Sequence, residues 1–106
     1  MGSEEIEFDA AKNETNVLKH GVDLKFGARV LSDPALVSVE DTRKNYGETR
    51  WQALGAVEHR VYVVVHTRRE YSNPDPAKPT PRCRIISVRK ANARETRIYR
   101  KATTKS

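Results

Sequence analysis

The sequence predicts an α+β domain in which an antiparallel sheet of four or five strands carries two N-terminal helices and one C-terminal helix. Three observations predict it: helical spacing with capping residues over 10–31, β-rich runs over 36–88, and a second capping pattern near residue 92. Helices gathered on one side of such a sheet would leave its other face open. The length of 106 residues supports a single domain, 1–106, because a second core would have almost nothing to bury.

Two helices are expected early in the chain. A short strand at 6–8 is followed by Asp9, whose side-chain oxygen can accept the unpaired amides at the start of a helix over 10–20. Gly21 can take the left-handed conformation that ends helices. A second helix is expected over 23–31, where apolar residues recur at helical spacing before a proline stops them.

The middle of the chain is expected to form strands. Residues such as Val, Ile, Trp and Tyr mark four runs, which cover 36–39, 49–57, 60–68 and 83–88. Glu58 and His59 form a tight connection between the second and third runs, so those strands should pair as an antiparallel hairpin. Cys83 lies in an apolar strand-like run and is expected to be a buried packing residue rather than a nucleophile.

The last third of the chain contains a predicted loop and a predicted helix. Four prolines remove amide donors from 70–81, so this segment is expected to be a long exposed loop. Asn92 is predicted to cap a helix that runs through Tyr99, with Glu95 as its capping-box partner. Two terminal segments are expected to fray, 1–4 and 101–106.

The net charge of +6 hides an asymmetry between the two halves of the chain. Residues 1–58 carry seven Lys or Arg against eleven Asp or Glu, a balance of −4, whereas residues 59–106 carry thirteen against three, a balance of +10. A basic half attracts phosphate backbones or an acidic partner. The charge therefore favours nucleic acid without excluding a protein.

Several classes of protein are excluded by what the sequence lacks. A single cysteine can form neither an internal disulfide nor a cysteine-rich zinc site. There is no HExxH motif and no glycine-rich phosphate loop, so neither a metal ion nor a cofactor is expected. No apolar run approaches the roughly 20 residues of a membrane helix, and the acidic start at 4–7 is unlike a signal peptide. A cytoplasmic protein with no membrane contact is expected.

Strand alternation predicts what the open face of the sheet displays. We expect Trp51 to form the core with Val61, Val63 and Val65, which share one face of their strand. The opposite side would then carry cationic and polar residues, namely Arg50, Gln52, His66, Arg68, Ser87 and Arg89. Such a surface suits metal-independent RNA cleavage, in which the ribose 2′-hydroxyl attacks the adjacent phosphate. Histidine can transfer the proton near neutral pH, and planar guanidinium groups match phosphate oxygens. Three tyrosines could stack on an unpaired base: Tyr62, Tyr71 and Tyr99.

Motifs along nearly the whole chain also occur in the order found in a known family. These are Phe8-Asp9, Lys12-Asn13, Asn16, Lys19-His20-Gly21-Val22, Asp33-Pro34, Glu40-Asp41, Tyr46-Gly47-Glu48-Thr49-Arg50, Leu54-Gly55, Val63-Val64-Val65-His66-Thr67, and Arg84 to Ala91 with Glu95 and Tyr99. Together they resemble the BrnT toxins of bacterial type II toxin-antitoxin modules. The resemblance implies a RelE-like fold and an endoribonuclease that blocks translation. It also implies neutralisation by a cognate BrnA-like antitoxin of the ribbon-helix-helix type, through which the complex binds operator DNA.

The resemblance and the strand alternation together indicate two groups of site residues. The catalytic group is Arg50, His66, Arg89, Glu95 and Tyr99. The RNA-binding group is Lys19, His20, Arg68, Arg84 and Ser87. We expect Arg50 and Arg89 to hold phosphate and His66 to transfer the proton, with Glu95 or Tyr99 assisting. This hypothesis requires Arg50, His66 and Arg89 to converge in one accessible pocket.

Two questions stay open at the level of sequence. Alternation places Arg84 on the opposite strand face from Arg89, so either a bulge redirects Arg84 or its role is structural, as in an ion pair. The protein could also be a non-catalytic basic module that binds nucleic acid or protein, or a structural or regulatory subunit. A binding module would never cut RNA, and a structural subunit would not be toxic when expressed.

Overall fold

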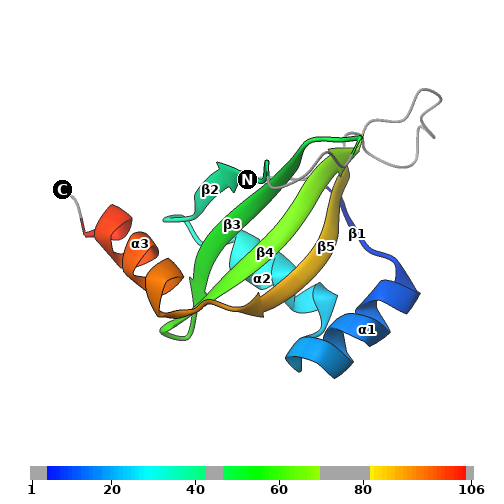
Figure 1. Ribbon diagram of the computed structural model, residues 1–106, viewed down its shortest axis with the longest axis horizontal. Coiled ribbons are helices and arrows are strands. Elements are labelled where there is room, and N and C mark those ends of the chain that lie inside the picture. The colour runs from blue at the N-terminus through cyan, green and yellow to red at the C-terminus, as the bar shows by residue number, and fades with distance from the viewer. Residues whose placement is uncertain (1–4, 43–46, 70–81, 105–106) are drawn as a thin grey trace.

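The computed structural model describes residues 5–42, 47–69 and 82–104 and shows a sheet with helices on both of its faces (Figure 1). The strands are β1 (Glu5–Glu7), β2 (Val37–Glu40), β3 (Arg50–Val57), β4 (Arg60–Arg69) and β5 (Arg82–Lys90). The helices are α1 (Ala10–His20), the 3-10 helix η1 (Leu24–Phe26), α2 (Gly27–Leu31) and α3 (Ala93–Thr103). The expected loop at 70–81 and the residues 1–4 and 105–106 lie outside the described residues.

The strands form one sheet in the order β1-β5-β4-β3-β2, and this sheet is mixed rather than antiparallel. β1 pairs in parallel with β5, with Ile6 opposite Cys83, while the other neighbouring strands are antiparallel. The predicted α+β class is therefore confirmed, but the prediction of a purely antiparallel sheet is wrong. A strand of three residues carries little local information about its partner, which here lies far along the chain.

The local signals at α1 and at the β3–β4 turn are confirmed. Asp9 accepts hydrogen bonds from two amides in the first turn of α1, at 2.8 and 3.2 Å. Gly21 ends the helix with a φ of 71°, in the left-handed region that glycine adopts without strain. Glu58 and His59 have φ of 51° and 69°, the positive values that a two-residue hairpin turn of type I′ requires.

The helix expected over 23–31 is instead two short pieces, η1 and α2. Leu24 in η1 and Val30 in α2 are both fully buried against the sheet. An uninterrupted α-helix, at about 100° per residue, would turn these two side chains about 120° apart. The tighter turn of a 3-10 helix brings them closer to a common direction, so both can reach the core.

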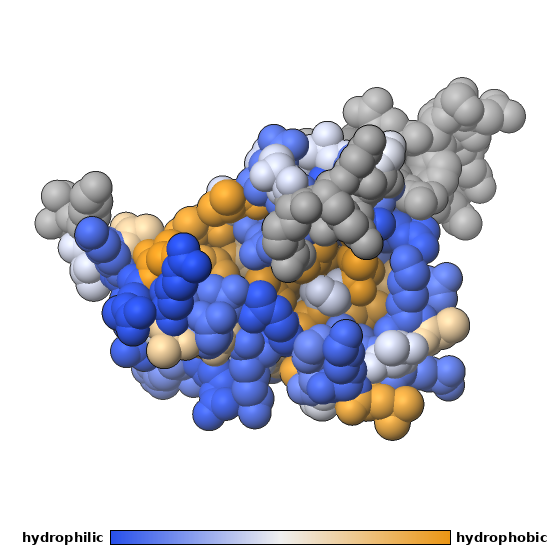
Figure 2. Space-filling model, in the orientation of Figure 1, coloured by the Kyte–Doolittle hydropathy of each residue, from blue (hydrophilic) through white to orange (hydrophobic). Residues whose placement is uncertain are grey.

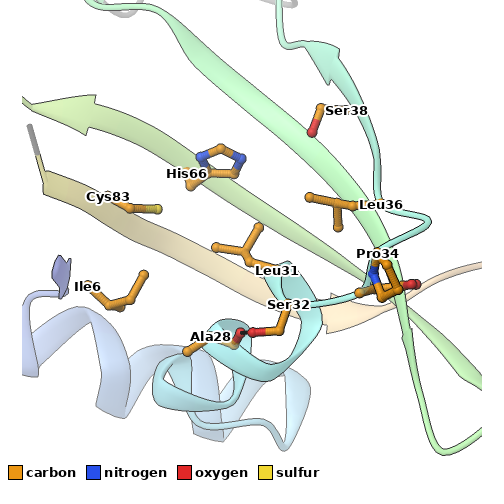
Figure 3. A pocket seen from close by; sticks show the side chains of 10 residues that line it. Ile6, Ala28, Leu31, Ser32, Pro34, Leu36, Ser38, His66 and Cys83 are labelled. Atoms are coloured by element: carbon orange, nitrogen blue, oxygen red, sulfur yellow. Dashed lines mark hydrogen bonds between the residues drawn. The ribbon is translucent and has the colours of Figure 1, made fainter. Parts of the chain in front are cut away.

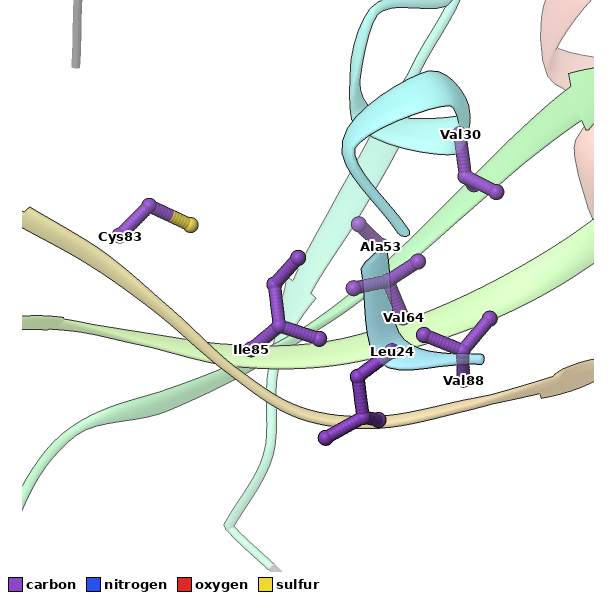
Figure 4. Packing of buried hydrophobic residues seen from close by; sticks show 7 residues of the cluster. All are labelled: Leu24, Val30, Ala53, Val64, Cys83, Ile85 and Val88. Carbon is purple, nitrogen blue, oxygen red and sulfur yellow. The ribbon is translucent and has the colours of Figure 1, made fainter. Parts of the chain in front are cut away.

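One face of the sheet, which we call the α2 face, packs against η1 and α2. Its buried side chains form a single cluster (Figure 4), which consists of Leu24, Val30, Ala53, Val64, Cys83, Ile85 and Val88. Cys83 is buried, as predicted. α2 lies so close to β3 that a Cβ at Gly55 would be 2.5 Å from the carbonyl oxygen of Val30.

The opposite face, which we call the α3 face, packs against α3. Leu54, Val61, Val63 and Tyr99 form its buried cluster. The prediction that the helices gather on one side is therefore wrong. The apolar run 61–65 points to both sides of β4, so both faces need cover. α3 also continues to Thr103, so part of the expected frayed segment 101–106 is helical.

Candidate functional site

Three rows of cross-strand neighbours line the α3 face, because residues that pair directly across a sheet share one of its faces. One row joins Leu54, Val63 and Arg89. The next joins Gln52, Val65 and Ser87, and the third joins Arg50, Thr67 and Arg84. The sheet therefore brings four predicted site residues to one face: Arg50, Arg84, Ser87 and Arg89.

A bulge in β5 places Arg84 on this face. Val65 pairs with Ser87 and the next residue, His66, pairs with Ile85, so Ile86 is an extra residue on β5. The extra residue interrupts the alternation of side chains between the two faces, so the residues of β5 before Ile86 point to the opposite face from the one that unbroken alternation predicts. Both possibilities left open by the sequence are observed: the bulge places Arg84 on the face of Arg89, and Arg84 also forms an ion pair with Glu7.

His66, in contrast, lies on the α2 face. It pairs with Trp51, whereas Arg50 pairs with the following residue of β4, Thr67, and successive strand residues point to opposite faces. The imidazole borders a cavity of about 570 Å³ walled by β1, α2 and β5 (Figure 3). The prediction that His66 converges with Arg50 and Arg89 is therefore wrong. The prediction assumed that Trp51 shares a face with Val61, Val63 and Val65. That assumption is wrong, because Trp51 lies on the α2 face with His66, whereas these valines point to the α3 face.

Arg89 is bound to the start of α3. Its guanidinium donates two hydrogen bonds to the carboxylate of Glu95, each 2.8 Å long. Glu95 also accepts the amide of Asn92 at 2.9 Å, and the Asn92 side chain accepts the amide of Glu95, which confirms the predicted capping box. The hydrogen bonds from Arg89 hold the pKa of Glu95 below its usual value, although burial opposes them. Glu95 thus fixes the guanidinium of β5 to the helix.

The other two arginines of the α3 face also lie beside carboxylates. Nε of Arg50 is 3.0 Å from Glu48, and a terminal guanidinium nitrogen of Arg84 is 3.8 Å from Glu7. Locally, the face is therefore less positive than the basic second half of the chain suggests. An incoming phosphate would compete with carboxylates for these guanidinium groups.

The two ion pairs differ in how well the sequence predicts them. Glu48 lies only two residues before Arg50, in the bend that leads into β3, so this short-range pair could have been anticipated from the opposite charges alone. The contact between Glu7 and Arg84 depends on the pairing of β1 with β5, which no local pattern encodes.

The C-terminal end of α1 lies beside β5 and close to Arg89. The side chain of Asn16 donates to the carbonyl of Val88 at 2.8 Å and accepts the amide of Val88 at 3.3 Å. The pKa of His20 is lowered by partial burial and then by the positive charges of Lys19 and Arg89. The positive charge of Arg89 therefore acts on His20, a predicted RNA-binding residue.

The tyrosines of the described residues have packing roles. The hydroxyl of Tyr99, which is 9% exposed, donates a hydrogen bond to Asp33, and Asp33 also accepts the amide of Ala56 at 2.8 Å. Burial and this hydrogen bond raise the pKa of Tyr99 to about 12, while the same bond lowers that of Asp33 against its own burial. The Tyr62 ring packs edge-on against Phe26 on the α2 face, with centroids 4.8 Å apart. Tyr71 lies outside the described residues.

Other predictions concern groups that the structure describes only in part. The side chain of Arg68 lies outside the description, although its backbone belongs to β4. Among the described residues, no three His, Cys, Asp or Glu side chains are grouped so that they could hold a metal ion. No helix in the described segments is long and apolar enough to cross a membrane.

Comparison with protein families gives one match. Residues 8–95 match the family described as "Ribonuclease toxin, BrnT, of type II toxin-antitoxin system". The matched segment contains α1, strands β2 to β5 and the Arg89–Glu95 pair. No curated protein matches the chain.

Proposed function

From the membership of this chain in the BrnT family of ribonuclease toxins of type II toxin-antitoxin systems, we propose a specific activity. The chain is an endoribonuclease that cleaves RNA on its α3 face without a metal ion. In this proposal its fold is of the RelE type and its activity inhibits translation in the cytoplasm. A cognate BrnA-like antitoxin of the ribbon-helix-helix type neutralises it, and operator DNA binds only through that antitoxin.

The observation that carries this proposal is that Arg50, Arg84, Ser87 and Arg89 share one face, where the bulge in β5 places Arg84. Planar guanidinium groups bind phosphate oxygens through paired hydrogen bonds and can stabilise charge that develops on a phosphoryl group. The hydroxyl of Ser87 lies in the row between those of Arg84 and Arg89 and can donate a further hydrogen bond.

The proposed reaction is a transesterification within the RNA. The ribose 2′-oxygen forms a bond to phosphorus while the bond to the 5′-oxygen of the next nucleotide breaks, which leaves a 2′,3′-cyclic phosphate and a 5′-hydroxyl. The 2′-hydroxyl must lose a proton and the leaving oxygen must gain one. We assign the proton acceptor to His20, because its lowered pKa favours the neutral imidazole near neutral pH and because α1, which ends at His20, is hydrogen-bonded to β5 next to Arg89.

Two residues of the predicted catalytic group are given other tasks. A tyrosine whose pKa is raised to about 12 and whose proton is held by Asp33 is poorly suited to proton transfer at neutral pH, so we assign Tyr99 to the core. Glu95 positions Arg89 through its two hydrogen bonds. Lys19 adds positive charge for RNA beside His20.

The test is cleavage of fluorescent oligoribonucleotides by the purified full chain in the presence of a chelator. We expect fragments with 2′,3′-cyclic phosphate ends and no cleavage where the attacking ribose is replaced by 2′-deoxyribose. Arg89→Ala should slow cleavage by about 100-fold or more. Arg89→Lys should have an intermediate cleavage rate, because it keeps the positive charge but loses the paired hydrogen-bond donors of the guanidinium group. Arg29→Ala removes the same charge from an exposed position of α2 and serves as the matched control.

Three results would contradict the proposal. Binding of RNA that Arg89→Ala weakens, without any cleavage by the folded wild type, would establish the non-catalytic module instead. Loss of activity with chelator and its return with a divalent ion would exclude the metal-independent mechanism. Equal pH–rate profiles for wild type and His20→Ala would exclude His20 as the proton acceptor, because loss of that group should remove the acidic limb.

A further inference from the structure

A second cavity lies on the α3 face, between the edge strand β2 and helix α3. Its volume is about 270 Å³. Gln52 and Leu54 of β3 line it together with Val39 of β2, which pairs with Gln52 in the sheet, and Ile98 lines it from α3. Figure 2 shows apolar surface beside the C-terminal helix, bordered by hydrophilic side chains. Val39 and Ile98 are both large apolar side chains that stand open to solvent, 57% and 44% exposed respectively.

The cavity combines apolar walls with polar groups at defined places. Arg94 and Glu95 contribute charged groups to its lining. The half-buried Gln52 brings a side-chain amide that, among the described residues, makes no hydrogen bond with the protein. An amide offers a donor and an acceptor side by side, so it can pair with a ligand edge that carries the complementary groups.

This cavity adjoins the residues to which we assign phosphate binding. Glu95 both lines the cavity and binds the Arg89 guanidinium through two 2.8 Å hydrogen bonds. Gln52 follows Arg50 by two residues on the same face, about 7 Å along the strand. Gln52 also shares a cross-strand row with Ser87. Arg50 and Arg89 each adjoin a residue that lines the cavity, so a ligand there would lie beside these arginines of the α3 face.

We propose that this cavity binds one unstacked nucleobase of the RNA, held between Val39 and Ile98 and recognised by the amide of Gln52. The inference rests on the proposed ribonuclease function and names the specificity subsite of that activity. Flat heteroaromatic rings with hydrogen-bonding edges suit a slot with apolar walls and a polar group inside it. A glutamine amide forms paired hydrogen bonds with N6 and N7 of adenine, so adenine is the expected base.

The size of the cavity favours a base over a protein segment. Pockets that take drug-sized ligands span about 300 to 1,000 Å³, so a cavity of about 270 Å³ is suited to a single small ring system. An amphipathic helix of a partner needs a groove that accepts several anchors spaced along it. The position beside two arginines also matches a nucleotide, which carries a phosphate on the sugar of its base.

Nucleotide binding can be measured without catalysis. Isotope-labelled full chain would be titrated with AMP, CMP, GMP, UMP and inorganic phosphate while its NMR spectrum is recorded. We expect AMP to shift the side-chain signals of Gln52 and Ile98 and to bind most tightly. Gln52→Leu should weaken AMP about tenfold or more and remove the preference among bases. Ile98→Ala should weaken the binding of all four nucleotides. Leu18→Ala, at an exposed position of α1, is the matched control that should change nothing.

Failure of the subsite and failure of the ribonuclease proposal give different results. If the chain cuts RNA but AMP leaves Gln52 and Ile98 unmoved, or Gln52→Leu cuts with unchanged base preference, the base subsite is refuted while the activity stands. If AMP shifts both residues but the chain never cuts RNA, the activity is refuted while the subsite stands. Signal shifts caused by antitoxin at Gln52 and Ile98, with none caused by nucleotides, would show a protein interface and overturn the inference.

Discussion

Asn16 should be among the most sensitive polar positions of the fold, because its side chain acts as a partner for the edge of β5. β1 covers β5 from Arg82 to Arg84, and at Val88 the side chain of Asn16 takes the place of a neighbouring strand. The amide nitrogen of Asn16 donates to the carbonyls of Val22 and Val88, each at 2.8 Å, and its oxygen accepts the Val88 amide at 3.3 Å. Asn16 is only 5% exposed.

Asn16→Ala should lower the free energy of unfolding by about 3 kcal/mol. It removes three hydrogen bonds, each worth about 1 kcal/mol net, and leaves backbone groups of the fully buried Val88 without a partner. Asn13→Ala is the matched control in the same helix, since it removes one hydrogen bond, from the Leu24 amide at 2.7 Å, and should cost about 1 kcal/mol. The gain in helix propensity is the same in both variants and cancels.

The measurement is urea unfolding of wild type and both variants, compared at equal m-values. The reasoning is refuted if Asn16→Ala costs no more than Asn13→Ala. A third variant, Asn16→Asp, tests the donors separately, because at neutral pH a carboxylate can only accept and would face two carbonyls. Burial raises the pKa of that carboxyl in the folded state. The free energy of unfolding of Asn16→Asp should therefore approach that of the wild type as the pH falls and the carboxyl is protonated.

Two further predictions concern the contacts between layers. Tyr99→Phe removes the hydrogen bond to Asp33, and because folding raises the pKa of Tyr99 from 10.0 to about 12, the wild type should lose stability as pH rises through that interval while Tyr99→Phe should not. Ultraviolet titration of tyrosine ionisation alongside unfolding measures this, and identical alkaline profiles would contradict it. Gly55→Ala should lower the free energy of unfolding by about 1 to 3 kcal/mol, because the added Cβ would lie 2.5 Å from the carbonyl oxygen of Val30. Thermal unfolding checks this, and an unchanged midpoint would show that α2 can move away from β3.

Most of the local structure could be predicted because its signals are local. Asp9 and Gly21 define the ends of α1 by short-range hydrogen bonding and by backbone freedom, and the turn at Glu58 and His59 requires only its own two residues. The direction of β1 and the side on which α3 packs depend on which surfaces remain uncovered after the rest has folded. That information is distributed over the whole chain, and no short window contains it.

The position of His66 was predictable from the sequence once the turn was assigned. A two-residue turn at Glu58 and His59 places Val57 opposite Arg60, and counting back along both strands places Trp51 opposite His66. Alternation within one strand shows which of its residues share a face. It does not show which face of the neighbouring strand lies on the same side of the sheet, and the turn supplies that information. The bulge at Ile86 was not predictable in the same way, since it appears only in the register between β4 and β5.

The same arginines serve the fold and the proposed activity, which has a physical consequence. Arg50, Arg84 and Arg89 share a face, and each lies beside a carboxylate from a different part of the chain, namely Glu48, Glu7 and Glu95. These carboxylates reduce the repulsion among the guanidinium groups before RNA arrives. A phosphate must replace or share these partners, so binding exchanges one anion for another instead of filling an empty positive pocket. Of the three pairs, Arg89 with Glu95 has the best geometry and is also part of a helix cap. We therefore expect the Arg89–Glu95 pair to be the last that phosphate separates, and Arg50 and Arg84 to make the first contacts with phosphate.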